Sequence, residues 1–436
     1  MKRLIVFLLT ILLAGCFCSC DITEVIPINT APQKTDETVT PYQEVVPDNL
    51  TFNEGYEPVV STYSYDELPL EGEKELYNKI LANCYDISPE KKEGTDRYPM
   101  PEIELNGYSL SEAQVRTAAK ALSDDHPEIF WLTGTMGYYC DDSMTALQIY
   151  SSYSPEEVST RVNAMRGVVN SFYQTVPDGL SEYDREVMVH DYLIDRVTYD
   201  PEVDTINLDN NNPDSYTAYG ALVNQVSVCE GYARAFQMLM NGLGVDCVCV
   251  IGSSQDQMHI WNASLLGEDW YYIDPTWDDQ EETYARYIYC NVNEDYLLDD
   301  HTFSPLFSEL EDEEINGETG HYGASLMNIY VPECTADELF YYKQASPHLT
   351  DYEGEEVKRG MLTAAENQED FYVFYVEDDL DYQTVINDLF VNYPQHFFSY
   401  IEAVNNSLSD YSIDSSNISY FTLEKSRIVA IELHYY

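Results

Sequence analysis

The clearest hydrophobic pattern along the chain follows Cys229. Apolar side chains recur there with the 3.6-residue period of one helical face, at Tyr232, Ala233, Phe236, Leu239, Met240 and Leu243. Gly242 and Gly244 then act as stop signals. The pattern predicts a helix that packs into a core, with Cys229 at or just before its first turn.

After Gly244 the pattern becomes that of strands. Residues 245–251 are apolar at all but one position, which is typical of a short strand buried on both faces. A loop is expected at 253–257, followed by a strand over 258–266 that carries His259. Leu-Gly-Glu-Asp at 266–269 indicates a hairpin turn. Asp274 would end the returning strand, so His259 and Asp274 are expected on neighbouring antiparallel strands.

Cysteine, histidine and aspartate at these places are the groups that nucleophilic cysteine chemistry requires. The unpaired N–H groups and the dipole at a helix N-terminus favour a thiolate over a thiol. An imidazole accepts the thiol proton, and a carboxylate on its other ring nitrogen fixes tautomer and orientation. Taken alone, Cys229 is more often read as a buried core cysteine, and His259 is equally compatible with a structural role.

Three motifs resemble the transglutaminase-like superfamily of papain-like cysteine enzymes: V-C-E-G-Y-A at 228–233, H-I-W-N at 259–262 and W-Y-Y-I-D-P-T-W-D-D at 270–279. The resemblance implies an α+β papain-like fold, with the nucleophile at a helix N-terminus packed on an antiparallel sheet and α/β regions flanking this core. It also implies catalytic roles for Cys229, His259 and Asp274. A weaker resemblance covers 183–200, where an amphipathic helix is predicted and His190 is assigned to the core.

The sequence does not single out the group that would stabilise an oxyanion. The backbone N–H of Cys229 is one expected donor. Related cysteine proteases use a glutamine upstream of the nucleophile, which here indicates Gln225, and Tyr219 is the competing candidate. Beyond the Pro275 turn, Asp278 and Asp279 are expected to face solvent.

The N-terminus has the pattern of a secretory signal. Residues 1–15 combine Lys-Arg, an apolar run over 4–13 and small residues, and the run is too short to span a membrane as a helix. Leu-Ala-Gly-Cys at 13–16 resembles a bacterial lipobox, which implies cleavage before Cys16 and lipidation of its thiol; an ordinary signal peptide is the alternative. We therefore expect a lipid-anchored protein at the cell membrane, facing outside the cytoplasm.

Composition divides the remaining chain. Residues 16–70 are rich in Thr, Pro, Glu and Val without a sustained period, so that after the lipidated Cys16 they are predicted to form a disordered tether. The chain beyond residue 70 exceeds the length that one core usually serves. It is predicted to comprise an accessory α+β region at 71–175, the catalytic core at 176–300 and a C-terminal α/β region at 301–436.

The strongly negative net charge limits the kinds of partner that the chain can bind. The chain has 21 basic and 78 acidic residues and a net charge of −57, which argues against nucleic acid because phosphates need a basic face. It also disfavours an anionic lipid surface, so that the acyl chains must provide the attachment. Acidic clusters at 299–300 and 311–314 leave Ca²⁺ open without an EF-hand spacing. No other cofactor or metal is expected, since Cys247 and Cys249 lack a second pair at zinc spacing and are predicted as buried strand residues.

Two classes of function are compatible with these observations. The first is cysteine-dependent acyl transfer at amide bonds through a thioester; water as acceptor gives a peptidase or amidase, and an amine gives a transglutaminase. We favour hydrolysis, because a cell-surface site is open to water, and we expect a protein, peptide or cell-wall substrate. The second is a catalytically silent module that binds proteins or cell-wall polymer. The intact Cys229, His259 and Asp274 favour the enzyme.

Overall fold

The structure is a computed structural model of the chain. The residues that it describes are 24–27, 61–105, 110–140, 144–203, 212–255, 257–306, 313–315, 318–320 and 327–436. They fall into two compact units. The first comprises the chain up to Trp270 together with Leu298–Cys334, and the second comprises Tyr271–Leu297 together with Thr335–Tyr436. The division passes through β9 (Asp269–Ile273).

A four-stranded sheet and three helices open the first unit. The strands have the order β1-β3-β4-β2, with β1 (Glu24–Pro27), β2 (Tyr98–Glu104), β3 (Leu132–Cys140) and β4 (Met144–Ser151). Helices α1 (Tyr63–Glu67) and α2 (Glu71–Asn83) both pack on α3 (Glu112–Asp125). The backbone N–H groups of Ser64 and Tyr65 donate to the Asp125 carboxylate at 3.0 and 2.9 Å. Strand β1 and helix α1 thus lie within 16–70, the stretch whose composition predicts a tether. The buried Asp125 carboxylate anchors α1, and β1 pairs with β3.

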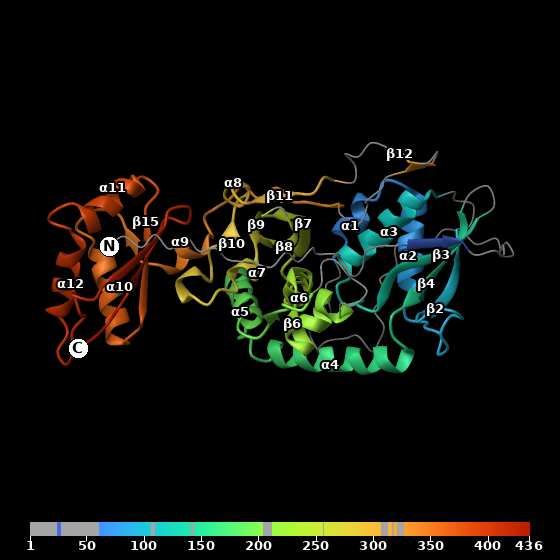
Figure 1. Cartoon of the computed structure of the whole chain (residues 1–436), viewed down its shortest axis with the longest axis horizontal. Helices are drawn as coiled ribbons and strands as arrows, with labels where there is room; N and C mark the ends of the chain where they lie inside the picture. Colours follow the sequence, from blue (N-terminus) through green and yellow to red (C-terminus); the bar gives the residue numbers. More distant parts are fainter. Residues whose placement is uncertain are drawn as a thin grey trace. The chain divides into compact units, whose positions relative to one another are not determined.

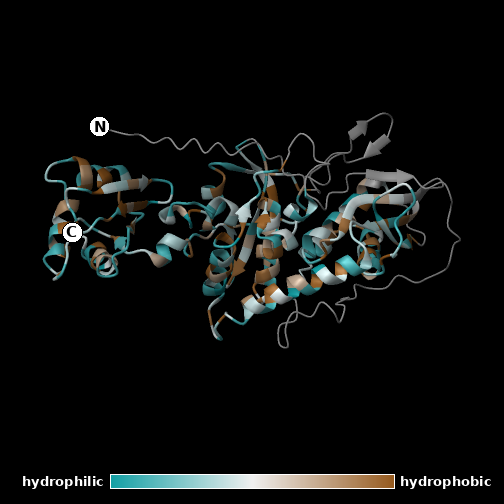
Figure 2. Cartoon of the chain, turned by 60° about the horizontal axis from the view of Figure 1, so that its bottom comes forward, coloured by the Kyte–Doolittle hydropathy of each residue, from teal (hydrophilic) through white to brown (hydrophobic). Residues whose placement is uncertain are grey.

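Two amphipathic helices come next in the chain. The buried residues of α4 (Pro155–Tyr173) include Val158, Val162, Met165 and Val169, which share one helical face. Hydrophobic and hydrophilic bands alternate along this helix in Figure 2. The predicted helix within 183–200 is α5 (Glu182–Ile194), where His190 is buried as expected.

The segment before Cys229 is irregular. Its short elements are η2 (Pro213–Tyr216), the π-helical turn η3 (Gly220–Asn224), and β6 (Val226–Ser227), which pairs in parallel with β5 (Thr198–Tyr199). Val228 is then the N-cap of α6 (Cys229–Gly242), so the helix begins at the cysteine and ends at the glycine that the pattern indicates.

A five-stranded sheet accompanies α6. Its order is β10-β9-β8-β7-β11, with β7 (Cys247–Ser254), β8 (Gln257–Leu266), β10 (Cys290–Val292) and β11 (His301–Phe303) beside β9. Helix α6 packs on β7 and β8 (Figure 1). The turn between β8 and β9 contains Gly267 at φ 70°, so the expected hairpin is present. The loop expected at 253–257 is shorter than predicted, because Ser254 and Gln257 are paired strand residues.

Strand β11 can approach β7 because residue 252 is glycine. In the ladders, Gly252 is the partner of both His259 in β8 and Phe303 in β11. A Cβ atom at this position would overlap the backbone oxygen of Thr302 and the ring of Trp261. Any larger residue would therefore separate β11 from β7, and with it His301 from the sheet.

The second unit has its own sheet and core. The strand order is β14-β15-β17-β16, with β14 (His348–Leu349), β15 (Phe371–Val376), β16 (Ser419–Leu423) and β17 (Ile428–Glu432). Its helical elements are α7 (Pro275–Asp278), η4 (Thr283–Ala285), α8 (Glu294–Leu297), α9 (Tyr341–Ala345), α10 (Glu355–Glu366), α11 (Tyr382–Ile386), η7 (Asn387–Val391) and α12 (Phe397–Asn405). Phe374, Phe397 and Leu389 are fully buried in the core between them.

Strands β12 (Glu313–Ile315) and β13 (Glu318–Gly320) pair with each other in antiparallel fashion. Among the residues that the structure describes, no helix combines the length and the apolar character needed to cross a bilayer.

Candidate functional site

Cys229 is fixed by a tightly folded entry to α6. The N–H of Val228 donates to the Ser215 carbonyl at 2.9 Å, and the Ser227 hydroxyl donates to the same oxygen at 2.8 Å. Residue 231 must be glycine, because a Cβ atom there would overlap the Ser227 hydroxyl oxygen. The V-C-E-G-Y-A motif thus has a structural reason for its glycine, which lets the first turn of α6 lie against the preceding segment.

The surroundings of Cys229 are apolar. Its exposed fraction is 1%, and it belongs to a buried cluster with Ala233, Cys249, Ile251 and Ile260, against which Met258 packs. Met258 and Ile260 are the two neighbours of His259 in β8. The cluster therefore brings the start of α6 to the part of β8 that carries the predicted histidine.

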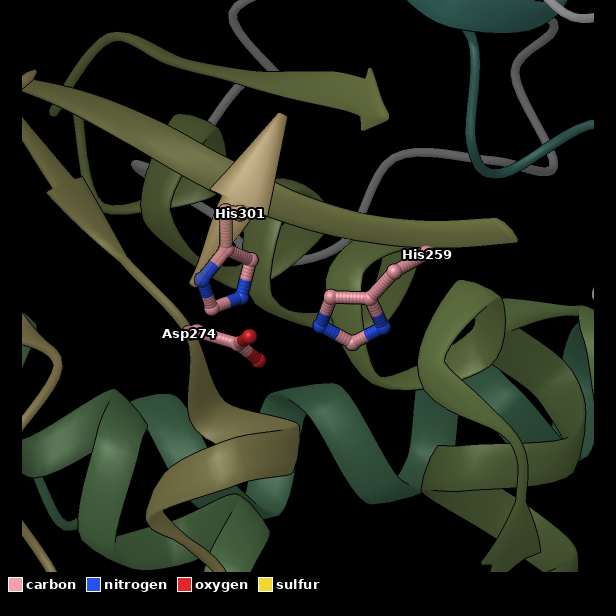
Figure 3. Close-up of side chains that lie close together, drawn as sticks. All are labelled: His259, Asp274 and His301. Atoms are coloured by element: carbon pink, nitrogen blue, oxygen red, sulfur yellow. The ribbon is translucent and has the colours of Figure 1, made fainter. Parts of the chain in front are cut away.

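His259, Asp274 and His301 lie close together (Figure 3). One ligand-type atom of each residue, a ring nitrogen or a carboxylate oxygen, lies within 4.8 Å of the other two, and all three residues are buried. His259 comes from β8, Asp274 directly follows β9, and His301 opens β11. The two residues expected on neighbouring strands are thus close in space, and a second histidine joins them.

Asp274 owes its position to the turn that follows β9. It is the N-cap of α7, and its Oδ1 accepts hydrogen bonds from the N–H groups of Thr276 and Trp277 at 3.0 and 3.1 Å. Its own N–H donates to the Tyr289 carbonyl at 3.1 Å. Pro275 occupies the first helical position, which proline tolerates because the N–H there needs no partner within the helix.

The position of Asp278 contradicts one prediction. It was expected to face solvent, but it is fully buried and its Oδ1 accepts a hydrogen bond from the Tyr289 N–H at 2.9 Å. The reason is that residues 275–278 form a helical turn, which returns Asp278 to the strand region before β10. Asp279, the next residue, is partly exposed.

His301 was missed by sequence reasoning. Its Nδ1 lies 2.6 Å from Asp300 Oδ1, and its ring lies 5.5 Å from that of His259, measured between centroids. Trp261 meets the same ring edge-on at 5.1 Å. The indole N–H of Trp261 is buried and has no hydrogen-bond partner in the described part of the chain. The sequence signal that could have indicated His301 is its place directly after Asp299 and Asp300. That acidic pair was interpreted only as a possible Ca²⁺ ligand.

The two oxyanion candidates lie upstream of α6. Gln225 is exposed and has a left-handed backbone, with φ 59°, where η3 ends. Tyr219 is partly buried; its ring stacks on Phe130 at 5.1 Å, and the Arg161 guanidinium lies 4.7 Å from its centroid. Tyr219 thus belongs to an aromatic and cationic stack, whereas Gln225 belongs to a surface turn.

The other described cysteines have structural positions. Cys247 and Cys249 are buried in β7, as predicted, and Cys84, Cys290 and Cys334 are also buried. Burial raises the pKa of Cys249 to about 12 and that of Cys247 well above its usual value. These two thiols are therefore protonated at neutral pH. Cys16, the expected lipidation site, lies outside the described residues.

The fold and these motifs define a transglutaminase-like domain of α+β architecture. Residues 171–275 match the family model of the transglutaminase-like superfamily. The predicted papain-like fold class is confirmed by this match.

Two solved structures are similar to parts of the chain. One, from Cytophaga hutchinsonii, is described as a candidate cysteine protease; it is 16% identical, the match covers 26% of this chain and 37% of that one, and the TM-score is 0.22. The other is described as a TGase, with 15% identity, coverage of 40% and 50%, and a TM-score of 0.25. The chain thus spans half or less of either structure. No curated protein matches it.

Proposed function

We propose that the protein catalyses acyl transfer at amide bonds, with Cys229 as nucleophile, His259 as general base and acid, and Asp274 as the carboxylate that orients the imidazole. The observation that carries the proposal is the proximity of His259, in β8, to Asp274, which directly follows β9. Strand β8 packs on α6, the helix that begins at Cys229. A helix N-terminus favours the thiolate form of a cysteine, and a carboxylate beside an imidazole favours the imidazolium.

The reaction proceeds in two halves. His259 takes the thiol proton as the Cys229 sulfur attacks the amide carbonyl carbon, and the backbone N–H of Cys229 stabilises the oxyanion. The C–N bond then breaks, His259 gives its proton to the leaving amine, and a thioester remains on Cys229. In the second half, His259 takes a proton from the incoming water, which attacks the thioester carbonyl carbon. The C–S bond then breaks and His259 gives that proton to the Cys229 sulfur, which releases a carboxylic acid and restores the thiol.

Hydrolysis is the proposed outcome, on a protein, peptide or cell-wall substrate outside the cytoplasm. The choice of water follows from the proposed location outside the cytoplasm, where acyl chains on Cys16 anchor the protein and water is the most abundant acceptor. An amine acceptor would use the same thioester and would give transglutaminase activity instead.

A catalytically silent binding module is the second candidate. The observation that favours it is the burial of Cys229, whose exposed fraction is 1%, because a nucleophile must reach its substrate. Under the enzyme proposal, substrate binding has to open a path to the sulfur. Under the binding proposal, the cysteine is a core residue and no path is needed.

One experiment separates the outcomes. The full chain is incubated with a thiol-directed activity probe and with a library of peptides and amines, and the products are identified by mass spectrometry. Cleaved amides with a probe adduct on Cys229 support hydrolysis, and new isopeptide bonds support amine transfer. If neither product forms and Cys229 stays unlabelled in the folded protein, the enzyme proposal is contradicted.

A further inference from the structure

The site contains one histidine more than the proposed reaction uses. A cysteine, histidine and aspartate mechanism needs a single imidazole, which is His259, whereas His301 is equally buried and lies in the same group. Two imidazoles and a carboxylate are ligands that Zn²⁺ commonly takes in proteins, and three protein ligands typify its open sites. The combination therefore has the composition of a transition-metal site.

Hydrogen bonds orient two of the three ligands. His301 Nδ1 lies 2.6 Å from Asp300 Oδ1, and metal-binding histidines characteristically donate their second ring nitrogen to a carboxylate or carbonyl in this way. Nε2 is then the nitrogen of His301 that would bind a metal. Asp274 is oriented by the N–H groups of Thr276 and Trp277. Such outer contacts raise the affinity of a site because they lower the entropy that the ligands lose on binding.

We propose that His259, His301 and Asp274 bind a divalent transition-metal ion, and that Zn²⁺ fits best. Tetrahedral Zn²⁺ separates its nitrogen and oxygen ligands by about 3.3 Å. The three ligand atoms already lie within 4.8 Å of one another, so they need to approach by no more than about 1.5 Å.

Bound Zn²⁺ would inhibit acyl transfer, because it takes the His259 imidazole that the Cys229 thiol proton requires. This consequence rests on the proposed function, whereas metal binding itself does not. The site would thus make a cell-surface enzyme responsive to free Zn²⁺, and chelation would restore its activity.

Calorimetric titration of the metal-stripped full chain with ZnCl₂ tests the proposal. We expect one ion per chain with a Kd below about 1 µM, that is, a binding free energy beyond about −8 kcal/mol. His301→Gln should weaken binding at least about 100-fold, and Asp300→Asn, which retains all three ligands, about 10- to 100-fold. The control is His434→Gln, at a surface histidine beside Glu432, and it should bind like the wild type. Visible absorption of a four-coordinate Co²⁺ complex provides a second readout.

The outcomes are distinguishable from those of the activity test. No binding by the wild type at about 100 µM Zn²⁺, or equal affinity in His301→Gln and His434→Gln, would overturn the inference. Circular dichroism shows whether each variant is folded, and if His301→Gln is not, Asp300→Asn decides. Because calorimetry needs no substrate, a chain that binds Zn²⁺ but transfers no acyl group contradicts only the proposed function. A chain that hydrolyses amides but binds no Zn²⁺ contradicts only this inference.

Discussion

Asp278 accepts a hydrogen bond from the Tyr289 N–H at 2.9 Å, while the Tyr289 carbonyl accepts one from the Asp274 N–H at 3.1 Å. The same residue before β10 therefore contacts both ends of α7. Asp274 and Asp278 are both buried carboxylates that accept backbone hydrogen bonds. They form a matched pair of which only Asp274 lies beside His259.

The first prediction uses this pair. Asp274→Asn and Asp278→Asn both keep an oxygen that accepts the backbone hydrogen bonds, so both variants should fold. Asp274→Asn should lower turnover by about one to three orders of magnitude, less than in a serine triad, because a cysteine ionised by its histidine leaves less proton transfer to organise. Asp278→Asn should stay near the wild type. Turnover on the cleaved peptide is measured, and a fully active Asp274→Asn enzyme would place the orienting carboxylate elsewhere.

Removing the Asp278 acceptor altogether gives a second prediction, on stability. Asp278→Ala leaves the buried Tyr289 N–H without its partner, which should lower the free energy of unfolding by about 1–3 kcal/mol. Asp279→Ala is the control, since Asp279 is partly exposed and should change stability little. Urea unfolding measures both, and equal stabilities would show that the Asp278 hydrogen bond contributes nothing.

The third prediction concerns thiol reactivity. Cys229 at the start of α6 should react with iodoacetamide with a midpoint well below the free-thiol pKa of about 8.5. Cys249 should remain unreacted at neutral pH in the folded chain, because burial raises its pKa to about 12. Site-resolved mass spectrometry against pH gives both profiles from one sample. Cys229→Ala should abolish turnover without unfolding the domain, and a Cys229 midpoint near 8.5 would remove the case for an activated thiol.

The fourth prediction concerns Cys16. Lipidation there should make the mature protein partition into the detergent phase, and Cys16→Ser should leave an unprocessed precursor without acyl chains. Phase separation and the mass of the N-terminal peptide are the measurements. Unchanged processing and partitioning in Cys16→Ser would rule out the lipobox, with Cys18→Ser as the control that should behave like the wild type.

The fifth prediction is a pH dependence of stability. Partial burial lowers the pKa of His348, but hydrogen bonds to Glu377 and to the Lys343 carbonyl outweigh it, so that the pKa is raised overall. The two ring nitrogens lie 2.7 and 2.8 Å from these acceptors. Because the folded pKa exceeds the unfolded value of about 6.5, the stabilisation is complete below that pH and is lost as pH rises through the raised folded value.

Thermal unfolding tests this dependence. Between pH 6 and pH 9, the melting temperature of the wild type should fall by about 1–3 °C more than that of His348→Gln, since a partly exposed ion pair contributes at most about 1 kcal/mol. His434→Gln is the control and should follow the wild type. Parallel curves for His348→Gln and the wild type would show that the pair does not favour the protonated histidine.

The sequence by itself determined the elements on which the site stands. The helical period after Cys229 set the start and end of α6, and Gly267 set the hairpin that brings the end of β9 beside the start of β8. These are local effects, because a helical face and a two-strand turn are specified within a dozen or so residues. The closeness of His259 and Asp274 follows from them.

Only the tertiary structure decided the other members of the site. After β10 joins one edge of the sheet beside β9, the chain crosses to the opposite edge, where β11 pairs with β7 and brings His301 to His259. Likewise, α7 returns Asp278 to Tyr289 and buries it. Hydrophobic periodicity states which side chains of a strand are buried, but it contains no information on which distant strand becomes its neighbour. That choice depends on packing, such as the space left by Gly252 between Trp261 and Thr302.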